Sequence, residues 1–174
     1  MISGKVWKFG ADVNTDAILP TAVMYLPAAQ QAQHVFSITR PGWAGQHVSD
    51  GDFILAGRNF GTGSSRPAPL ALNALGIKCL IADSINPLFL RNCVSFGLQA
   101  IECDGVSAAF EEGDIAEVSL EEGIVRNLRT GVVLQGMVIP DALLSLMRNG
   151  GIFPLLESEG LVGPGTDAAA GGAG

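Results

Sequence analysis

Short runs of apolar residues, each bounded by turn-forming residues, give the middle of the chain a regular pattern. These runs predict buried strands at 53–56, 79–82 and 98–103, and the segments 67–75 and 87–96 predict helices. Because strands and helices alternate here, we expect parallel strands with helices packed on them.

The N-terminal segment has a different pattern. Apolar and polar residues alternate from Gly4 to Phe9, which predicts a strand that runs into a polar, turn-forming loop at 10–16. The pattern between this loop and residue 46 is mixed. We expect a short helix at 28–36 and a loop at 40–45.

The C-terminal part of the chain is acidic. Alternating short runs from Glu111 to Leu134 predict an antiparallel hairpin or meander, with the acidic run 111–122 on a solvated sheet face. Residues 140–148 predict a last helix. The patterns together predict one α/β domain over residues 1–162, with a mixed, partly parallel sheet flanked by helices. The Gly- and Ala-rich residues 163–174 are expected to form a disordered tail.

Composition and charge narrow the possible partners. The 174 residues are 48% hydrophobic and 16% charged, with a net charge of −7, which argues against general nucleic-acid binding. Residues 1–100 carry seven basic and five acidic groups, whereas residues 101–174 carry three basic and twelve acidic groups. No apolar run approaches the roughly 18 residues of a membrane helix, so the high apolar content instead suggests a surface that a partner covers.

Cysteine and histidine usage argues against a metal centre in this chain. Cys79, Cys93 and Cys103 are widely spaced, no C-x-x-C pair exists, and His34 and His47 lie far from any cysteine in the sequence. We therefore expect no self-contained zinc or iron–sulfur site. Without a signal peptide or a disulfide framework, the expected location is the cytoplasm.

The loop 59–66, Asn-Phe-Gly-Thr-Gly-Ser-Ser-Arg, carries the candidate chemistry. Its two glycines let the backbone adopt conformations closed to other residues and let a ligand approach closely. Ser64 and Ser65 fall where the next helix should begin, a position that favours an anion. Arg66 adds a planar fork suited to a carboxylate. The loop therefore predicts an oxyanion-binding site.

Other interpretations of this loop remain open. Ser65 could be an ordinary helix cap and Arg66 a solvated side chain. A phosphate-binding P-loop is disfavoured because the lysine after the second glycine is missing. A nucleophilic serine site is also disfavoured, since Ser64 is not in a G-x-S-x-G context and neither histidine has a motif around it.

Three segments together resemble the small subunits of isopropylmalate dehydratase. They are the loop 59–66, the preceding run 5–20, which contains Asp-Val-Asn-Thr-Asp, and the run Ile-Asn-Pro-Leu-Phe-Leu-Arg-Asn-Cys at 85–93. The resemblance spans about residues 4–155. It implies the β/β/α swivelling fold of the aconitase superfamily and a hydro-lyase of leucine biosynthesis that interconverts 3-isopropylmalate and 2-isopropylmalate.

The same resemblance implies a division of labour between two chains. The 4Fe–4S cluster would lie in a separate large subunit, with which this chain would form a heterodimer or heterotetramer. The substrate would be a small carboxylate, and neither nucleic acid nor membrane would be a partner. Ser64 would be the general base, Arg66 would hold the substrate carboxylate, and Ser65 with Gly63 would complete the anion pocket.

Two further segments match the family's site. Thr15 and Asp16 match its T-D signature, which lines the same cleft; the alternative is a turn with a capping aspartate. The specificity loop corresponds to Met24-Tyr25-Leu26-Pro27, which has no arginine for a distal carboxylate. We therefore expect a substrate with an apolar or small group at that position.

Two departures from the family motif leave alternatives open. Thr62 stands where the family usually has cysteine, and Pro67 stands where it usually has glutamate. A related small subunit for a methylated malate, a methylated citrate or a homoaconitate-type substrate is one alternative. A diverged, non-catalytic swivel domain that binds a carboxylate or a partner is another.

Overall fold

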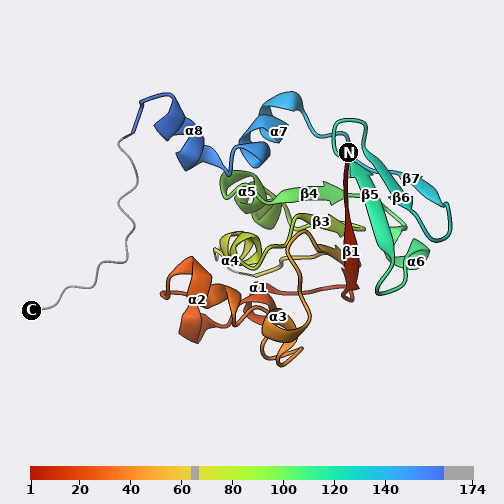
Figure 1. The fold of residues 1–174 in the computed structure, drawn as a ribbon, viewed down its shortest axis with the longest axis horizontal. Coiled ribbons are helices and arrows are strands. Elements are labelled where there is room, and N and C mark those ends of the chain that lie inside the picture. The colour runs from red at the N-terminus through yellow and green to blue at the C-terminus, as the bar shows by residue number, and fades with distance from the viewer. Residues whose placement is uncertain (64–66, 163–174) are drawn as a thin grey trace, which may run out of the picture.

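The computed structural model describes residues 1–63 and 67–162 (Figure 1). Its described strands form one seven-stranded sheet in the order β4-β3-β2-β1-β5-β6-β7. Their bounds are β1 Ile2–Lys8, β2 Phe53–Ala56, β3 Cys79–Ala82, β4 Gln99–Glu102, β5 Ile115–Ser119, β6 Ile124–Asn127 and β7 Val133–Gln135. Strands β1 to β4 are parallel neighbours, and β5 to β7 are antiparallel.

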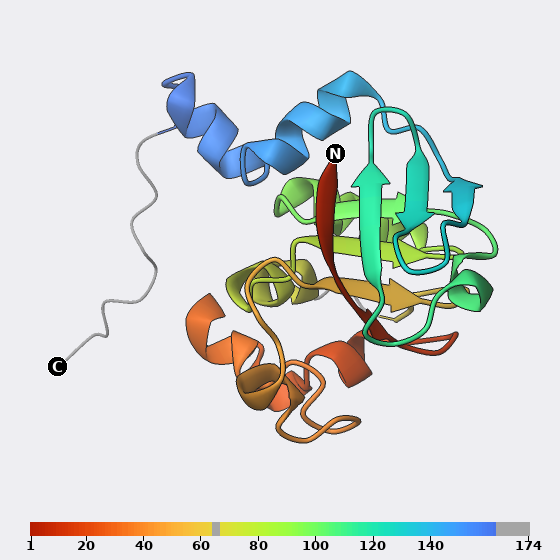
Figure 2. The same ribbon diagram turned by 45° about the vertical axis from the view of Figure 1, so that its right-hand side comes forward.

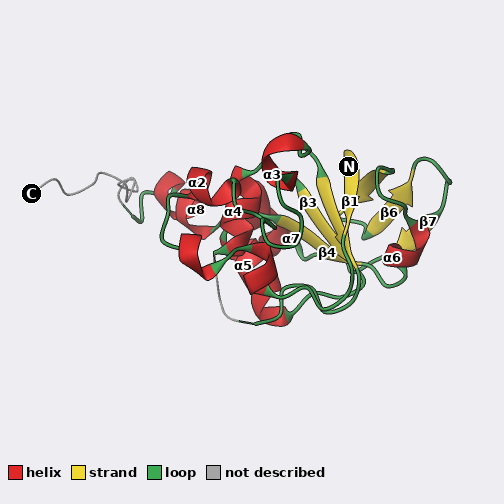
Figure 3. Ribbon diagram, turned by 90° about the horizontal axis from the view of Figure 1, so that it is seen from below, coloured by secondary structure: helices red, strands yellow, loops and turns green. Residues whose placement is uncertain are grey.

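The helices are short and pack mainly beside the parallel strands. Their bounds are α1 Thr15–Ile18, the 3-10 turn η1 Thr21–Val23, α2 Ala28–Ala32, α3 Trp43–Gln46, α4 Ala68–Ala74, α5 Pro87–Ser95, α6 Val106–Ala109, α7 Asp141–Arg148 and α8 Ile152–Ser158. Figure 3 shows α4 and α5 on one side of the parallel strands, with β6, β7 and α6 on the other side. No helix among the described residues is both long and apolar enough to span a membrane.

Every residue of β2 and β3 is buried, because layers cover both faces of the parallel strands. In β2, Ile54 and Ala56 join the core that includes the helices α4 and α5. Phe53 and Leu55 point to the other face, where they share a core with Ala116 of β5 and other residues of the antiparallel half. The antiparallel half therefore curls over the parallel half (Figure 2). This arrangement confirms the expected mixed sheet and its β/β/α layers.

Three expectations for local structure are corrected. Residues 40–45 are not wholly loop, because α3 begins at Trp43, a residue only 3% exposed that packs edge-on against Phe9 and Phe36. The helix expected at 28–36 ends as α2 at Ala32 and is followed by turns. The acidic run is not solvated throughout, because Asp114 is buried and accepts a hydrogen bond from Asn127 Nδ2 at 2.7 Å.

Candidate functional site

Two loops that follow neighbouring parallel strands are joined by backbone hydrogen bonds. The loop 10–16 follows β1, and the loop 57–63 follows β2. Gly61 N donates to Val13 O at 2.7 Å, and Thr15 N donates to Thr62 O at 2.8 Å. The carboxyl ends of parallel strands are the usual place for ligand sites in α/β proteins. The loop with the candidate chemistry is therefore held at such an edge.

A third loop, at 83–86 after β3, fixes the other side of the loop 57–63. Phe60 N donates to Ser84 O at 3.1 Å, and Asn86 N donates to Phe60 O at 2.8 Å. Asn86 also caps α5, since its side chain accepts a hydrogen bond from Leu88 N at 3.0 Å. The central loop is thus bonded on both sides, so its backbone position depends on all three loops.

Asp12 and Asn59 form a side-chain pair that the sequence analysis did not single out. Asn59 Nδ2 donates to Asp12 Oδ1 at 2.8 Å, and Asn59 N donates to Ser84 Oγ at 2.8 Å. Both residues adopt positive φ angles, 56° for Asp12 and 62° for Asn59. Asn and Asp tolerate this left-handed region better than most residues, and this tolerance is the signal in the sequence that could have marked the pair.

The two glycines of the central loop have the conformations that the sequence analysis attributed to them. Gly61 has φ +83°, and an added Cβ would lie 2.2 Å from Phe89 Cγ. Gly63 has φ +106°, and an added Cβ would lie 3.1 Å from Thr15 Oγ1. The structure therefore brings Gly63 and Thr15, two of the expected site residues, directly together.

The remaining expected site residues have different outcomes. Ser64, Ser65 and Arg66 lie outside the described residues. Asp16 lies in the first turn of α1 and is exposed, while Thr15 is 2% exposed. Asn14, not Asp16, caps α1, since its Oδ1 accepts a hydrogen bond from Ala17 N at 2.8 Å. Asp16 is therefore not the residue that caps α1.

The segment Met24–Pro27 lies between η1 and α2. Tyr25 is 89% exposed. The helix α2 that follows packs against α4, which is the helix that comes after residues 64–66 in the chain. Figure 1 shows α1, α2 and α4 near one another. The expected specificity segment therefore belongs to the same side of the molecule as the candidate site.

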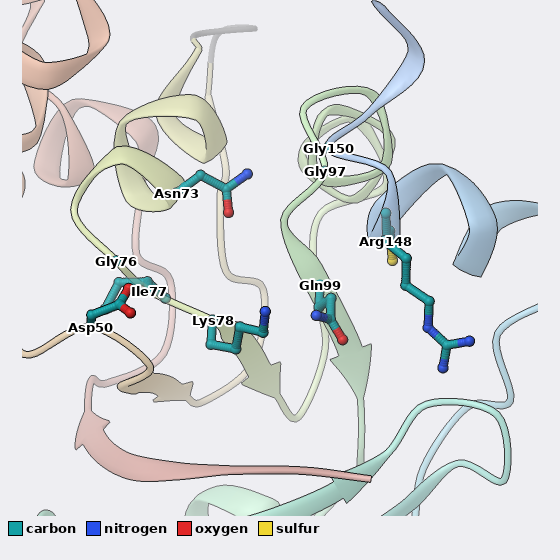
Figure 4. Close-up of a pocket in the computed structure, with 10 residues that line it drawn as sticks. Asp50, Asn73, Gly76, Ile77, Lys78, Gly97, Gln99, Arg148 and Gly150 are labelled. Atoms are coloured by element: carbon teal, nitrogen blue, oxygen red, sulfur yellow. The ribbon is translucent and has the colours of Figure 1, made fainter. Parts of the chain in front are cut away.

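Two cavities of about 290 Å³ differ in their relation to these loops. One lies against the loop 10–16, and its lining includes Phe9, Asp12 and Phe36. The other is shown in Figure 4 and is lined by residues that include Lys78 and Gln99. These two residues lie at the amino ends of β3 and β4, so this cavity opens at the opposite edge of the sheet from the candidate site.

The cysteines are poorly suited to bind a metal. Burial raises the pKa of the Cys79 and Cys93 thiols far above the ordinary range, and it raises that of Cys103 to about 11. A metal-binding cysteine must be deprotonated. Residues 1–63 and 67–162 contain no group of three potential metal ligands.

Comparisons with known proteins agree over most of the chain. The family model named Aconitase C-terminal domain matches residues 43–105. The isopropylmalate/citramalate isomerase small subunit of Methanocaldococcus jannaschii is 44% identical over 161 residues, which are 91% of this chain and 95% of the relative. The 3-isopropylmalate dehydratase small subunit 1 of Methanopyrus kandleri is 41% identical over 162 residues, which are 92% of this chain and 95% of the relative.

A solved structure shows the same fold. It is a crystal structure of 3-isopropylmalate dehydratase from Methanocaldococcus jannaschii, and it matches with a TM-score of 0.84 and 31% sequence identity. The match covers 92% of this chain and 95% of the crystallised chain. The fold of this chain therefore has a counterpart in a known protein over 92% of its length.

Proposed function

Because this chain belongs to the family of 3-isopropylmalate dehydratase small subunits, we propose that it forms a hydro-lyase with a large subunit. The complex would interconvert 3-isopropylmalate and 2-isopropylmalate in leucine biosynthesis, in the cytoplasm. The observation that carries this proposal is the match to named small subunits over about nine-tenths of both chains. In this assignment residues 1–162 are the swivelling domain, and 163–174 are a tail outside it.

The catalytic roles follow the family motif. Ser64 is the proposed base, which removes the proton alpha to a carboxylate and returns a proton on the other face of the intermediate. A free serine is far too weak a base for this step, so its alkoxide needs positive groups and amides nearby. Arg66 would supply that charge while it holds the substrate carboxylate. Ser65 would complete the anion pocket.

The described part of the site supports this arrangement. The absence of a side chain on Gly63 lets its backbone lie close to Thr15, since an added Cβ would lie 3.1 Å from Thr15 Oγ1. Asp16 lies next to Thr15 in the exposed first turn of α1. The hydrogen bonds between the loops after β1 and β2 join Thr15 to Thr62, which lies two positions before Ser64 in the chain. We propose that Thr15 and Asp16 line the substrate cleft.

The 4Fe–4S cluster belongs, in this proposal, to the large subunit. The described residues of this chain offer no three-ligand group, and their thiols are held protonated. When bound, the cluster would act as a Lewis acid on the substrate hydroxyl that leaves. The large subunit would form a heterodimer or a heterotetramer with this chain.

A second substrate, citramalate, has a specific observation in its favour. The Methanocaldococcus jannaschii relative that is 44% identical is named an isopropylmalate/citramalate isomerase small subunit. The segment Met24–Pro27 offers no arginine to pair with a distal carboxylate. This composition suits the isopropyl group of isopropylmalate or the methyl group of citramalate, and it argues against a homoaconitate-type substrate.

Anaerobic reconstitution with a cluster-bearing large subunit tests the proposal. The complex should interconvert the isopropylmalates, and Ser64→Ala should abolish turnover, while exchange of the exposed Ser49 for alanine should leave it unchanged. A complex that contains the intact cluster and yet turns over neither isopropylmalate nor citramalate would favour the non-catalytic alternative suggested by Thr62 and Pro67. Full activity of Ser64→Ala would refute the assignment of the base alone.

A further inference from the structure

Gln31 is hydrogen-bonded to the backbone of the expected specificity segment, Met24–Pro27. This residue of α2 is only 4% exposed. Its Nε2 donates to two backbone carbonyls, Met24 O at 2.9 Å and Leu26 O at 2.7 Å. The two bonds fall on either side of Tyr25, so one buried amide group fixes the backbone of the segment at two points.

These contacts determine how the side-chain amide is oriented. Only its NH₂ group can donate to both carbonyls, so Oε1 must point elsewhere. In the described part of the chain, Gln31 Oε1 is a buried atom with no hydrogen-bond partner. A buried acceptor without a partner is unfavourable. An apolar residue at this position would therefore suit the stability of α2 at least as well as glutamine. The two bonds to the segment are the reason to have glutamine here.

The position of Gln31 also joins the segment to the rest of the site. Gln31 N donates to Pro27 O at 3.0 Å, so the end of the segment is also the start of α2. Since α2 packs against α4, the position of the segment depends on the helix that follows residues 64–66 in the chain. Tyr25 stays outside this arrangement with its side chain 89% exposed.

We propose that Gln31 is a positioning residue for substrate selection. It sets the backbone of Met24–Pro27 so that the segment discriminates between the isopropyl and methyl groups of alternative substrates. This inference rests on the proposed function, because it assigns a determinant of selectivity to the same site. Gln31 acts through the segment and takes no part in proton transfer.

The test compares two variants of nearly equal size with a neighbouring control. Gln31→Met removes both donors, and Gln31→Glu replaces the donor group with a carboxylate oxygen that repels the two carbonyls. Gln30→Met is the control, because Gln30 belongs to the same helix and is exposed. Each variant is reconstituted with the large subunit, and kcat and KM are measured with isopropylmalate and with citramalate.

Release of the segment should change the ratio of kcat/KM for the two substrates. Each lost hydrogen bond corresponds to roughly a fivefold effect, and the loss of both to roughly 25-fold. We therefore expect the ratio to shift by roughly 5- to 25-fold in Gln31→Met, mostly through KM. Amide hydrogen exchange at Met24 and Leu26 should accelerate about tenfold or more in the same variant. Gln30→Met should show neither change.

A purely structural role would give a different result. It would lower kcat/KM for both substrates by one common factor, and that result would overturn the proposal. Unchanged exchange at Met24 and Leu26 in both Gln31 variants would overturn it as well. If the wild-type complex turned over neither substrate, the proposed function and the selective role would both fail, while the exchange measurement would still decide whether Gln31 holds the segment.

Discussion

Replacement of Gly61 by alanine should destabilise the chain more than the same replacement of Gly63, the other glycine with a positive φ in the loop 57–63. An added Cβ would lie 2.2 Å from Cγ and 2.5 Å from Cβ of Phe89. Phe89 is 1% exposed and packs edge-on against the buried Phe60, with ring centroids 5.4 Å apart. The ring therefore has no space into which it can move.

Two costs add up at this position. The φ of +83° places alanine in the left-handed region, which costs about 1–2 kcal/mol. Overpacking of a buried site costs about 1–3 kcal/mol more. The expected loss is therefore about 2–5 kcal/mol, which is a large part of the roughly 5–15 kcal/mol that stabilises a typical domain.

Alanine substitutions at two other glycines distinguish the backbone cost from the cost of overpacking. Gly63→Ala carries the backbone cost, but its Cβ would come no nearer than 3.1 Å to Thr15 Oγ1 and 3.9 Å to Thr15 N. Gly10→Ala meets no atom within 4 Å and should change the stability by less than about 1 kcal/mol. Urea unfolding of the full chain, followed by circular dichroism, measures all three. The reasoning is refuted if Gly61→Ala and Gly63→Ala lose the same free energy of unfolding.

Three further predictions concern residues around this loop and in the core. Asn59→Ala should cost about 1–2 kcal/mol of unfolding free energy, because it loses the hydrogen bond to Asp12 and keeps a positive φ; in thermal melts, Asn59→Gly should recover the backbone part. Hydrogen bonds, above all from Arg129, hold the pKa of Asp114 well below its ordinary value of 3.8. The stability they provide is complete above about pH 4 and declines as the pH falls toward the folded pKa, so Asp114→Asn should flatten this acid dependence in urea titrations. Burial raises the pKa of the Cys93 thiol, so iodoacetamide at pH 8 should label Cys93 only after unfolding, and rapid labelling of the native chain would contradict its burial.

Local sequence signals predicted the central strands well and the short helices poorly. The strands β2 and β3 coincide with the expected bounds 53–56 and 79–82, because turn residues flank each apolar run. The helix α3 was missed because Pro41, Gly42 and Gly45 are typical of loops. A single helical turn has little stability of its own, and burial of Trp43 against Phe9 and Phe36 is what stabilises this one.

The candidate site shows the same limit at the level of loops. Glycine at positions 61 and 63 is a local signal, so the sequence predicted the special backbone there. The pairing of Asp12 with Asn59 depends on β1 and β2 being neighbours in the sheet. The pattern of apolar residues does not indicate which strands are adjacent, so it could not predict this pair. Gln31 is a sharper case, since Gln30, Gln31 and Gln33 are equivalent as sequence letters. Only the packing of α2 buries the second of them and brings it to the carbonyls of Met24 and Leu26. The residue that we propose sets selectivity therefore looks like any other polar helix residue until the fold is known.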